Sequence, residues 1–470
     1  MIRRGYLAFR RRIARLSGAR GFDAAGGGRR WTGAQALPAL NSSALAGRGP
    51  IQDRARYLAG NNPHAAAAVE ALASALTGAG GIRPSSAHPD PETRGAVNAA
   101  FARWAEDPDG EGRTSLAALQ ALVARGMVRD GEALIQLRAD GGRLHPQMLD
   151  PRQLDGALHR DLGGGARIVA GVEFDAAGRR VAYHVFPDLP DLPLAVASLT
   201  PTRVPASEIL HVFRPQWPGQ VRGLSWFAPV ALRLADHDAA ADALLVRPKV
   251  EAQFAGFIYE QGPGAGGFEG ERSDGVLEAG MEPGSLHVLR PGQDIKFASP
   301  PSGSGAAGDF LRSQLRAIAA GLGLTYEALT GDLSGVNYSS IRAGAIDFRR
   351  RMEGVQEQVL IPQLLRPLWR RWLTLEVLSG RLPAPGFEAS PADWLAAEFI
   401  RPGWPWVDPQ NEIAADRLAV EAGFKSRREV VAGRGRELEA LDAEIAADGR
   451  APSPAADLAE DRETEDREDA

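Results

Sequence analysis

Cysteine is absent from the 470 residues, which excludes a disulfide scaffold and thiolate metal sites. No apolar run reaches about 18 residues, so the sequence predicts no membrane span. Lysine is scarce, with only Lys249, Lys296 and Lys425 beside many arginines. The chain carries 54 basic against 59 acidic residues. A protein that binds nucleic acid tightly is usually basic overall, and this mildly acidic chain is not.

The common enzyme motifs are also missing, namely G-x-x-x-x-G-K-[ST], G-x-S-x-G and H-E-x-x-H. The strongest chemical cluster is "ADHDAAAD", where Asp238 and Asp242 lie four residues apart on one helical face, next to Asp236 and His237. This spacing is compatible with a metal site. Three converging ligands are not visible, however, and a solvated helix face explains the pattern more simply. We therefore expect no enzyme activity and no cofactor.

A second carboxylate pair, Asp130-Gly131-Glu132, lies between a predicted helix and a predicted strand. Two carboxylates can perform acid–base chemistry, but a turn accounts for the pattern more simply. His145, His211 and His287 each follow Leu in strand-like contexts, and we expect core or edge positions for them. Arginine is so frequent that no single arginine stands out.

The two ends of the chain differ in charge. "MIRRGYLAFRRRIARLSGAR" is rich in arginine without an acid, and Arg interrupts every short apolar run, unlike in a secretory signal. We interpret residues 1–47 as a basic arm that is expected from its composition to be disordered. Residues 451–470 end in "DLAEDRETEDREDA", an acidic tail that is expected to be disordered.

Periodicity predicts an α+β chain. Two helices meet at Asn62-Pro63, a good N-cap followed by a favourable first helical residue. Further helices follow, the second of them capped at Thr114. Residues 130–215 form a β-rich module with a turn at 140–142 and a hairpin in "GVEFDAAGRRVAYHVF". A helix over 223–256, a Gly-rich insert, short strands over 276–298 and a helix from about 308 come next.

The most informative stretch is "GDLSGVNYSSIRAG", residues 331–344, which is predicted to join that helix to a long one over about 340–379. At 1.5 Å per residue the long helix would span roughly 60 Å, with bends at Pro362 and Pro367. Gly331 and Gly335 lack the lysine and the tight helix start of a phosphate-binding loop. Ser339 or Ser340 is expected to cap the long helix. Short helices follow over 404–447.

Five segments in this order resemble the portal proteins of tailed bacteriophages, of the lambda-type group. They are "NNPHAAAAVEAL", "FARWAED" with "LQALVARGMVRDGEALIQL", "RVPASEILHVFRP" with "PGQVRGLSWFAPVALRL", "FLRSQLRAIAAGLGLTYEALTGDLSGVNYSSIRAG", and "WPWVDPQNEIAADRLAVEAGFKSRREVVAGRGRE". Together they cover the chain from about Asn61 to about Gly433. The N-terminal arm and the insert at 261–275 carry no resemblance.

The resemblance implies a ring-forming subunit whose parts follow one another along the chain. Between the arm at 1–47 and the tail at 451–470, they are a wing at 48–222, a stem helix at 223–260, a clip at 261–305, a stem helix at 306–324, a tunnel loop at 325–340, a long helix with a return to the wing at 341–403, and a crown at 404–450. The tunnel-loop residues expected to meet DNA are Asp332, Ser334, Gly335, Val336, Asn337, Tyr338, Ser339 and Ser340.

The implied function is that of a DNA conduit at one capsid vertex, for genome packaging, head–tail joining and DNA ejection. The implied partners are eleven further copies of the chain, double-stranded DNA of any sequence, the terminase packaging motor, the major capsid protein and a head–tail adaptor, with no membrane. The implied location is the virion, and the host cytoplasm during assembly. Two alternatives stay open at this point: a metal-dependent enzyme using the cluster at 236–242, and a nucleic-acid-binding adaptor using the basic arm.

Overall fold

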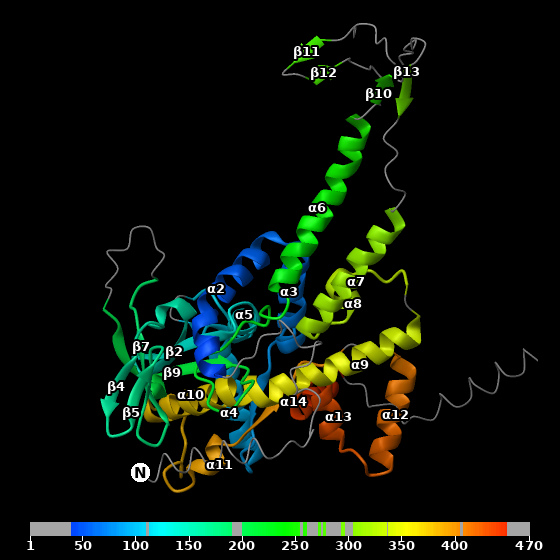
Figure 1. The fold of residues 1–470 in the computed structure, drawn as a ribbon. Helices are drawn as coiled ribbons and strands as arrows, with labels where there is room; N and C mark the ends of the chain where they lie inside the picture. The colour runs from blue at the N-terminus through cyan, green and yellow to red at the C-terminus, as the bar shows by residue number, and fades with distance from the viewer. Residues whose placement is uncertain are drawn as a thin grey trace, which may run out of the picture. The chain divides into compact units, whose positions relative to one another are not determined.

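The computed structural model describes residues 39–109, 112–189, 200–253, 257–260, 271–273, 276–278, 293–296, 304–335, 337–404 and 408–448 (Figure 1). Residues 1–46 and 47–470 form two separate units, and each is taken by itself. In the first unit, the described residues are 39–46, where helix α2 begins. Everything below concerns the second unit.

The N-terminal helices are α2 (Leu40–Asn61), α3 (Pro63–Thr77), α4 (Pro91–Glu106) and α5 (Leu116–Arg129). Asn62 caps α3 as predicted, because its side chain accepts a hydrogen bond from the Ala65 amide at 2.9 Å. The cap of α5 was predicted one residue too early. Ser115, not Thr114, accepts the hydrogen bond from the first turn of that helix, at 3.3 Å from the Ala118 amide.

A three-stranded antiparallel sheet follows, in the order β3-β2-β9, from β2 (Glu132–Asp140), β3 (Arg143–Leu149) and β9 (Ile209–Phe213). The predicted turn at 140–142 joins β2 to β3. The first half of β2 is buried on both faces, unlike a half-exposed strand. Ile135 belongs to the main core with α5, whereas Leu134 belongs to a second core beneath the other sheet. This central strand therefore separates two hydrophobic cores.

The second sheet is a five-stranded antiparallel meander. Its strands are β4 (Arg160–Gly163), β5 (Ala166–Val169), β6 (Val172–Phe174), β7 (Arg180–Val185) and β8 (Thr202–Pro205). The predicted hairpin is confirmed, with Val172 opposite Tyr183. Two short 3₁₀ segments, η3 (Pro151–Gln153) and η4 (Ala206–Glu208), flank the meander. The β-rich module predicted over 130–215 is therefore present.

Helix α6 (Ala231–Gln253) begins eight residues later than the sequence predicted. The preceding residues turn inward, because Trp226 and Phe227 are buried in the main core. Ser225 Oγ accepts a hydrogen bond from the Phe227 amide at 3.1 Å, which fixes that turn. Two strand pairs follow, β10 (Phe257–Glu260) with β13 (Gln293–Lys296) and β11 (Glu271–Ser273) with β12 (Val276–Glu278). Most of the Gly-rich insert at 261–275 lies outside the described residues.

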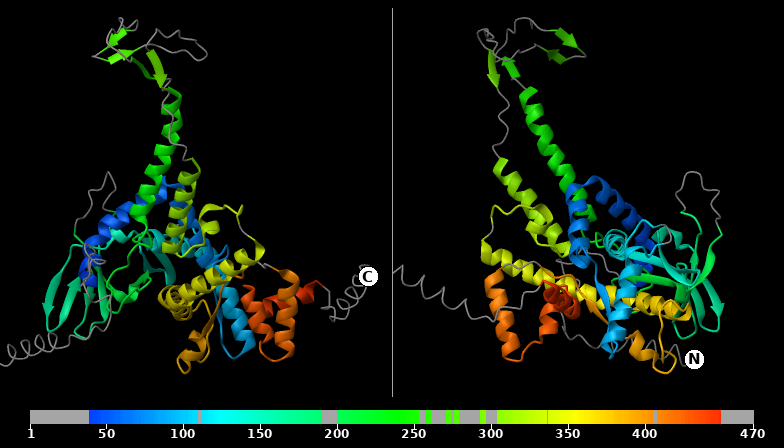
Figure 2. Two further views of the ribbon diagram at one scale, coloured as in Figure 1. Left: turned by 45° about the vertical axis from the view of Figure 1, so that its right-hand side comes forward. Right: turned by 180° about the vertical axis from the view of Figure 1, so that it is seen from behind.

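Helix α7 (Ser304–Leu322) returns beside α6 and leads through α8 (Tyr326–Thr330) into the long helical run. That run consists of α9 (Tyr338–Val355), a π-helical segment η5 (Gln356–Leu365) and α10 (Arg366–Leu378), which lie end to end (Figures 1 and 2). Pro362 lies inside the π segment. A proline removes one amide donor and crowds the preceding turn, so the helix widens where the sequence predicted a bend.

The long run lies against the N-terminal helices and the three-stranded sheet, since α9 contacts α3, η5 contacts β9 and α10 contacts β3. Aromatic side chains hold the long run against α4. Trp369 and Trp372 are fully buried, and their rings lie 5.0 and 4.9 Å from that of Phe101 on α4. Such tilted and edge-on pairs add specific geometry to a large apolar burial.

The chain closes with α11 (Pro391–Leu395), β14 (Ala397–Ile400), α12 (Pro409–Glu421), α13 (Arg427–Gly433) and α14 (Leu438–Ala447). Strand β14 pairs antiparallel with β1 (Arg83–Ser86), which connects the C-terminal part to α3 and α4. The predicted α+β class is confirmed. Over the described ranges, no helix has the length and apolarity needed to cross a membrane.

Candidate functional site

The predicted loop over 325–340 is shorter in the structure, because α8 occupies its first part. Thr325 caps this helix by accepting a hydrogen bond from the Ala328 amide at 3.1 Å. Leu329 is buried and holds the helix on the main core. Gly331 ends α8 in the left-handed region, with φ of 71°, which glycine adopts without steric cost. The open loop therefore starts at Gly331.

The far end of the loop was also misplaced. Asn337 is the N-cap of α9, since its side-chain oxygen accepts a hydrogen bond from the Ser340 amide at 2.9 Å. Tyr338, Ser339 and Ser340 consequently belong to the first turn of the helix and not to the loop. The prediction that Ser339 or Ser340 would cap α9 is wrong. The side chains of Tyr338 and Ser339, and all of Val336, lie outside the described part of the chain.

Asp332 organises the described part of the loop. Its Oδ1 accepts hydrogen bonds from the Oγ of Ser334 at 2.6 Å and from the Ser334 amide at 3.0 Å, and its Oδ2 accepts one from the Tyr326 hydroxyl at 3.2 Å. These bonds, led by that from the Ser334 side chain, lower the pKa of Asp332. Asp332 is thus a carboxylate at neutral pH, and it ties the loop to α8.

The rest of the loop is open to solvent. Leu333 is 61% exposed, and Ser334, Gly335 and Asn337 are exposed as well. In the sequence of residues 331–340, Asp332 is the only charged residue. Such a surface offers short polar contacts, and the sequence of residues 331–340 includes no Lys or Arg to bind phosphate.

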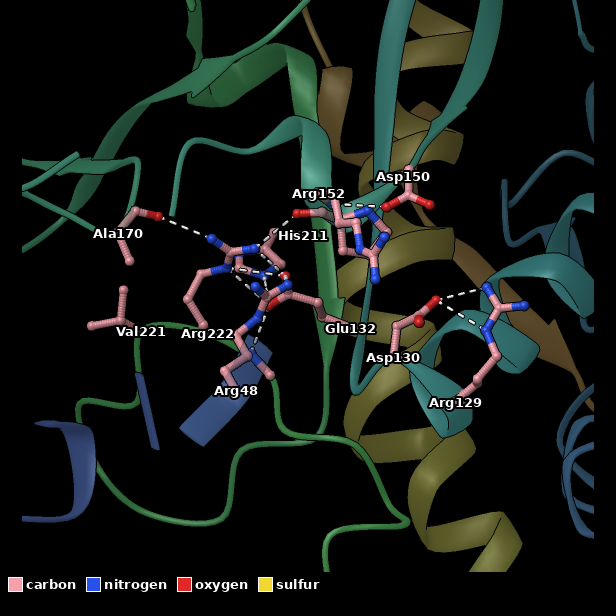
Figure 3. A network of polar contacts seen from close by, with 12 residues as sticks. Arg48, Arg129, Asp130, Glu132, Asp150, Arg152, Ala170, His211, Val221 and Arg222 are labelled. Carbon is pink, nitrogen blue, oxygen red and sulfur yellow. Dashed lines mark hydrogen bonds and ion pairs between the residues drawn. The ribbon is translucent and has the colours of Figure 1, made fainter. Parts of the chain in front are cut away.

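A second polar site lies in the interior, around Glu132 (Figure 3). Glu132 has no exposed surface, and its carboxylate accepts hydrogen bonds from Arg222, Arg48, His211 and the Gly223 amide. The Arg48 Nη2 contact is 2.7 Å and the Gly223 amide contact is also 2.7 Å. Burial alone would raise the pKa of Glu132, but Arg222, Arg48 and His211 outweigh burial and hold the pKa well below its usual range.

His211 is neutral in this site. Burial is the main cause that lowers its pKa to about 4, against the opposing attraction of Glu132. Its Nδ1 lies 3.3 Å from Arg180 Nη1, which can only donate, so Nδ1 accepts that hydrogen bond. The ring proton is therefore on Nε2, which donates to Glu132 at 3.1 Å. The expectation of a satisfied core histidine is confirmed for His211.

Arg222 extends the contacts of Glu132 to the backbone. Its Nη1 donates to the Ala170 carbonyl at 3.0 Å, and its Nη2 donates to the Pro151 carbonyl at 3.1 Å. Ala170 has a positive φ of 50°, which is unusual for a residue with a side chain. Arg222 thus connects the meander, the η3 segment and the chain that enters α6.

Asp130 forms the neighbouring cluster. Arg56 and Arg129 each donate to it at 2.7 Å, and Arg56 also contacts both oxygens of Asp150 at 2.9 Å. Burial opposes ionisation of Asp130, but Arg129 and Arg56 outweigh burial and lower its pKa. Together with the Arg48–Glu132 pair, these ion pairs attach helix α2 to the β-rich module. Few apolar side chains of α2 are buried, so this attachment depends on charge.

Glu132 and Asp130 are fully engaged by donors, and neither has a free oxygen that faces a substrate. The acid–base interpretation of this pair is therefore wrong, and the simpler turn describes Asp130 and Gly131, whereas Glu132 begins strand β2. The arginines were missed because arginine is common throughout the sequence. The available signal was the glycine that follows Arg222. Gly223 packs backbone against backbone with Gly131, which brings Arg222 beside Glu132.

The cluster at 236–242 does not converge. Asp236 and Asp242 are exposed, whereas His237 is buried with its ring 5.5 Å from that of His64. Burial lowers the pKa of His237. Among the described residues, no three His, Cys, Asp or Glu side chains are placed to share a metal ion. The basic arm of the alternative adaptor function lies outside the described residues up to residue 38.

Comparison with known proteins gives a consistent result. A family model described as "Phage portal protein, lambda family" matches residues 27–356, well over half of the chain. The chain is 28% identical over 422 residues to a probable portal protein of Halomonas phage phiHAP-1, covering 85% of this chain and 80% of that protein. It is 24% identical over 348 residues to portal protein B of Escherichia phage lambda, covering 67% of this chain and 65% of that protein.

Among solved structures, the neck of a native gene transfer agent particle computed with C12 symmetry is similar, with a TM-score of 0.44 and 17% identity. The match covers 83% of this chain and 99% of that chain. The sequence match and the arrangement of the described elements define a structural protein of the virion that has the portal function at the capsid vertex, and not an enzyme. The chain belongs to the lambda family of phage portal proteins.

Proposed function

We propose that this portal protein assembles head to tail into a closed ring of about twelve copies, around a channel that passes double-stranded DNA during packaging and ejection. The observation that carries the proposal is the large apolar surface that stays exposed on successive helices. The exposed side chains are Leu232, Leu245 and Val246 on α6, Phe310 on α7, Ile341 and Ile346 on α9, and Ile413, Leu418 and Val420 on α12.

Single exposed apolar residues are normal, but a series that follows four helices of one chain supports an interaction surface. Helix α12 has no buried residue, so the described part of the chain provides no apolar core against which it packs. Phe424, just after α12, is 84% exposed. Neighbouring copies would cover these faces. Contacts between different surfaces of identical chains close into a ring when the rotation allows it.

The division of the subunit follows chain order. In this proposal residues 48–222 form the wing, 223–260 and 306–324 the stem, 261–305 the clip, 325–340 the tunnel loop with α8, 341–403 the long helix and its return, and 404–450 the crown. The arrangement is supported by the two sheets of the first part and by α6 and α7, which enclose the β10–β13 strand pair.

Residues 331–337 would line the narrow part of the channel. Asp332 is the only charge in this loop, and its exposed neighbours are uncharged. Each phosphate that a cation neutralises adds affinity through counterion release, which would slow DNA that has to move. A loop without cations suits a conduit for DNA of any sequence.

The remaining partners follow from the same function. A separate terminase would supply ATP hydrolysis, because this sequence has no P-loop. The major capsid protein would surround the wing, and a head–tail adaptor would bind the clip end after packaging.

Assembly can be tested with the purified chain alone, without nucleotide or metal. Negative-stain electron microscopy should show rings with a central channel, and the particle mass should be near twelve times that of the 50.0 kDa chain. Monomers as the only species at micromolar concentration would contradict the ring.

A further inference from the structure

Helices α6 and α7 lie side by side and run in opposite directions, and each keeps a face that the other does not cover (Figure 1). The contact between them is marked by Arg233, whose Nη1 donates to the Gln314 side chain at 3.4 Å. Leu234 and Leu315 are buried on the covered sides. The uncovered sides point away from this contact, in different directions.

The uncovered face of α6 combines apolar ends with acidic groups. At spacings of three and four residues, which keep side chains on one helical face, the exposed residues are Leu232, Asp236, Ala239, Ala243 and Val246, with Asp242 at the edge. Leu232 is 67% and Val246 is 53% exposed. No base occurs in this set.

The face of α7 turned away from Gln314 is basic. Arg312 and Arg316 are exposed there, each two residues from Gln314, whereas Phe310 lies four residues before Gln314 on the other side of the helix. Arg312 has only a loose contact of 3.6 Å with Asp309, in which both side chains are mostly exposed. Arg316 lies over the Tyr326 ring, 5.5 Å from its centre, with its charge still open to solvent.

We propose that the uncovered face of α6 packs against the uncovered face of α7 from the next copy of this chain, with Asp236 opposite Arg312. The proposal rests on the ring assembly proposed above and names the surfaces that form it. A second copy is the occupant because the two faces are complementary in charge and lie on different sides of one helix pair. Such surfaces repeat from copy to copy without a second kind of partner.

The positions of Asp236 and Arg312 along the helix axes support this pairing. Asp236 is three residues beyond Arg233, and Arg312 is two residues before Gln314. Because the helices are antiparallel, both displacements go the same way along the pair, by about 3 to 5 Å at 1.5 Å per residue. A rotation about an axis along the helices keeps each group at its level, so Asp236 of one copy meets Arg312 of the next.

A charge swap tests the contact. Asp236→Arg or Arg312→Asp alone places like charges together at every interface, and should raise the protein concentration at half-assembly into rings at least tenfold. The combination restores opposite charges and should return this concentration to within about threefold of the parent. Arg160→Asp, an exposed reversal on β4, is the control and should assemble as the parent does. Mass photometry measures assembly, and circular dichroism confirms folding.

The absence of cysteine allows a second, independent measurement. The variant with both Asp236→Cys and Arg312→Cys should form a ladder of disulfide-linked oligomers on oxidation, whereas either single substitution should not extend beyond a dimer. No rings from the parent would contradict the proposed function and this contact together. Rings from the parent, with single reversals equal to the control or with no ladder, would overturn the α6–α7 contact and leave the ring standing.

Discussion

Gly131 and Gly223 pack backbone against backbone, so that neither position has room for a side chain. A Cβ on Gly223 would lie 2.7 Å from the Cβ of Glu132 and would overlap the Gly131 carbonyl. A Cβ on Gly131 would lie 2.7 Å from the Cα of Leu224, at a φ of +91° that favours glycine. This approach lets the Gly223 amide reach Glu132 and brings Arg222 to the same carboxylate.

We expect Gly223→Ala to destabilise the protein by about 3 kcal/mol or more, because overpacking typically costs about 1–3 kcal/mol and here the clash is with backbone. The measurement is the urea midpoint of unfolding. Gly80→Ala is the matched control, since its added Cβ meets nothing within 4 Å. Equal midpoints for the two variants would contradict the close packing at Gly223.

Acid should destabilise the fold through His211. Its pKa is about 4 in the folded protein against an ordinary value of 6.5, so the unfolded chain binds a proton that the folded chain does not between these values. The contribution of neutral His211 is therefore complete above about pH 6.5 and is lost as the pH falls towards 4. Converted at 1.36 kcal/mol per pH unit, the loss is about 3 kcal/mol.

His211→Gln tests this. Glutamine can still donate to Glu132 and accept from Arg180, but it does not titrate. Urea unfolding of parent and variant at several pH values should show a smaller loss of stability in the variant between pH 6.5 and 4. Parallel curves for the two proteins would show that His211 does not cause the acid sensitivity between pH 6.5 and 4.

Local elements were predictable because their signals are local. The Asn62-Pro63 start of α3 and the hairpin around Val172 and Tyr183 depend on residues that are neighbours in sequence. The cap of α9 was not predictable, since Asn337, Ser339 and Ser340 are all good N-cap residues. Which of them caps depends on where the helix finds its packing partners, and those lie far away in the sequence.

The interior site was harder to predict for the same reason. Glu132 and Arg222 are 90 residues apart, and nothing local indicates that they meet. Strand β2 illustrates it further, because the two faces of its first half meet two different hydrophobic cores built from distant segments. The loop was predicted over 325–340, but helices occupy both of its ends, and its role in DNA passage is still a prediction.

Loss of the Asn337 cap should loosen the first turn of α9. Replacing a capping Asn by Ala typically costs about 1 kcal/mol, so Asn337→Ala should raise amide exchange at Ser340 and Ile341 roughly fivefold. Asn337→Asp keeps an acceptor at the helix N-terminus and should protect these amides as well as the parent does. Exchange that is equally fast in both variants would show that the side chain does not cap the helix.

Leu333 is the best position for testing DNA contact, because it is exposed and its replacement leaves both helix caps intact. Leu333→Arg should leave ring assembly unchanged and slow DNA packaging, since a cation repeated around the channel strengthens phosphate contacts. Leu333→Ser is the control and should package at the parental rate. If the arginine variant packaged DNA at that same rate, the assignment of the loop to the channel wall would be wrong, and the proposed ring would still stand.

The two caps also determine where evolution can alter this region. Gly331 terminates α8 and Asn337 starts α9, so each helix is complete without the residues between them. Insertions there would disturb neither helix, and each doubling of a flexible loop costs only about 0.6 kcal/mol of closure entropy. On the proposed placement, the bore of the channel can thus be changed by loop length alone, independently of the diameter of the ring.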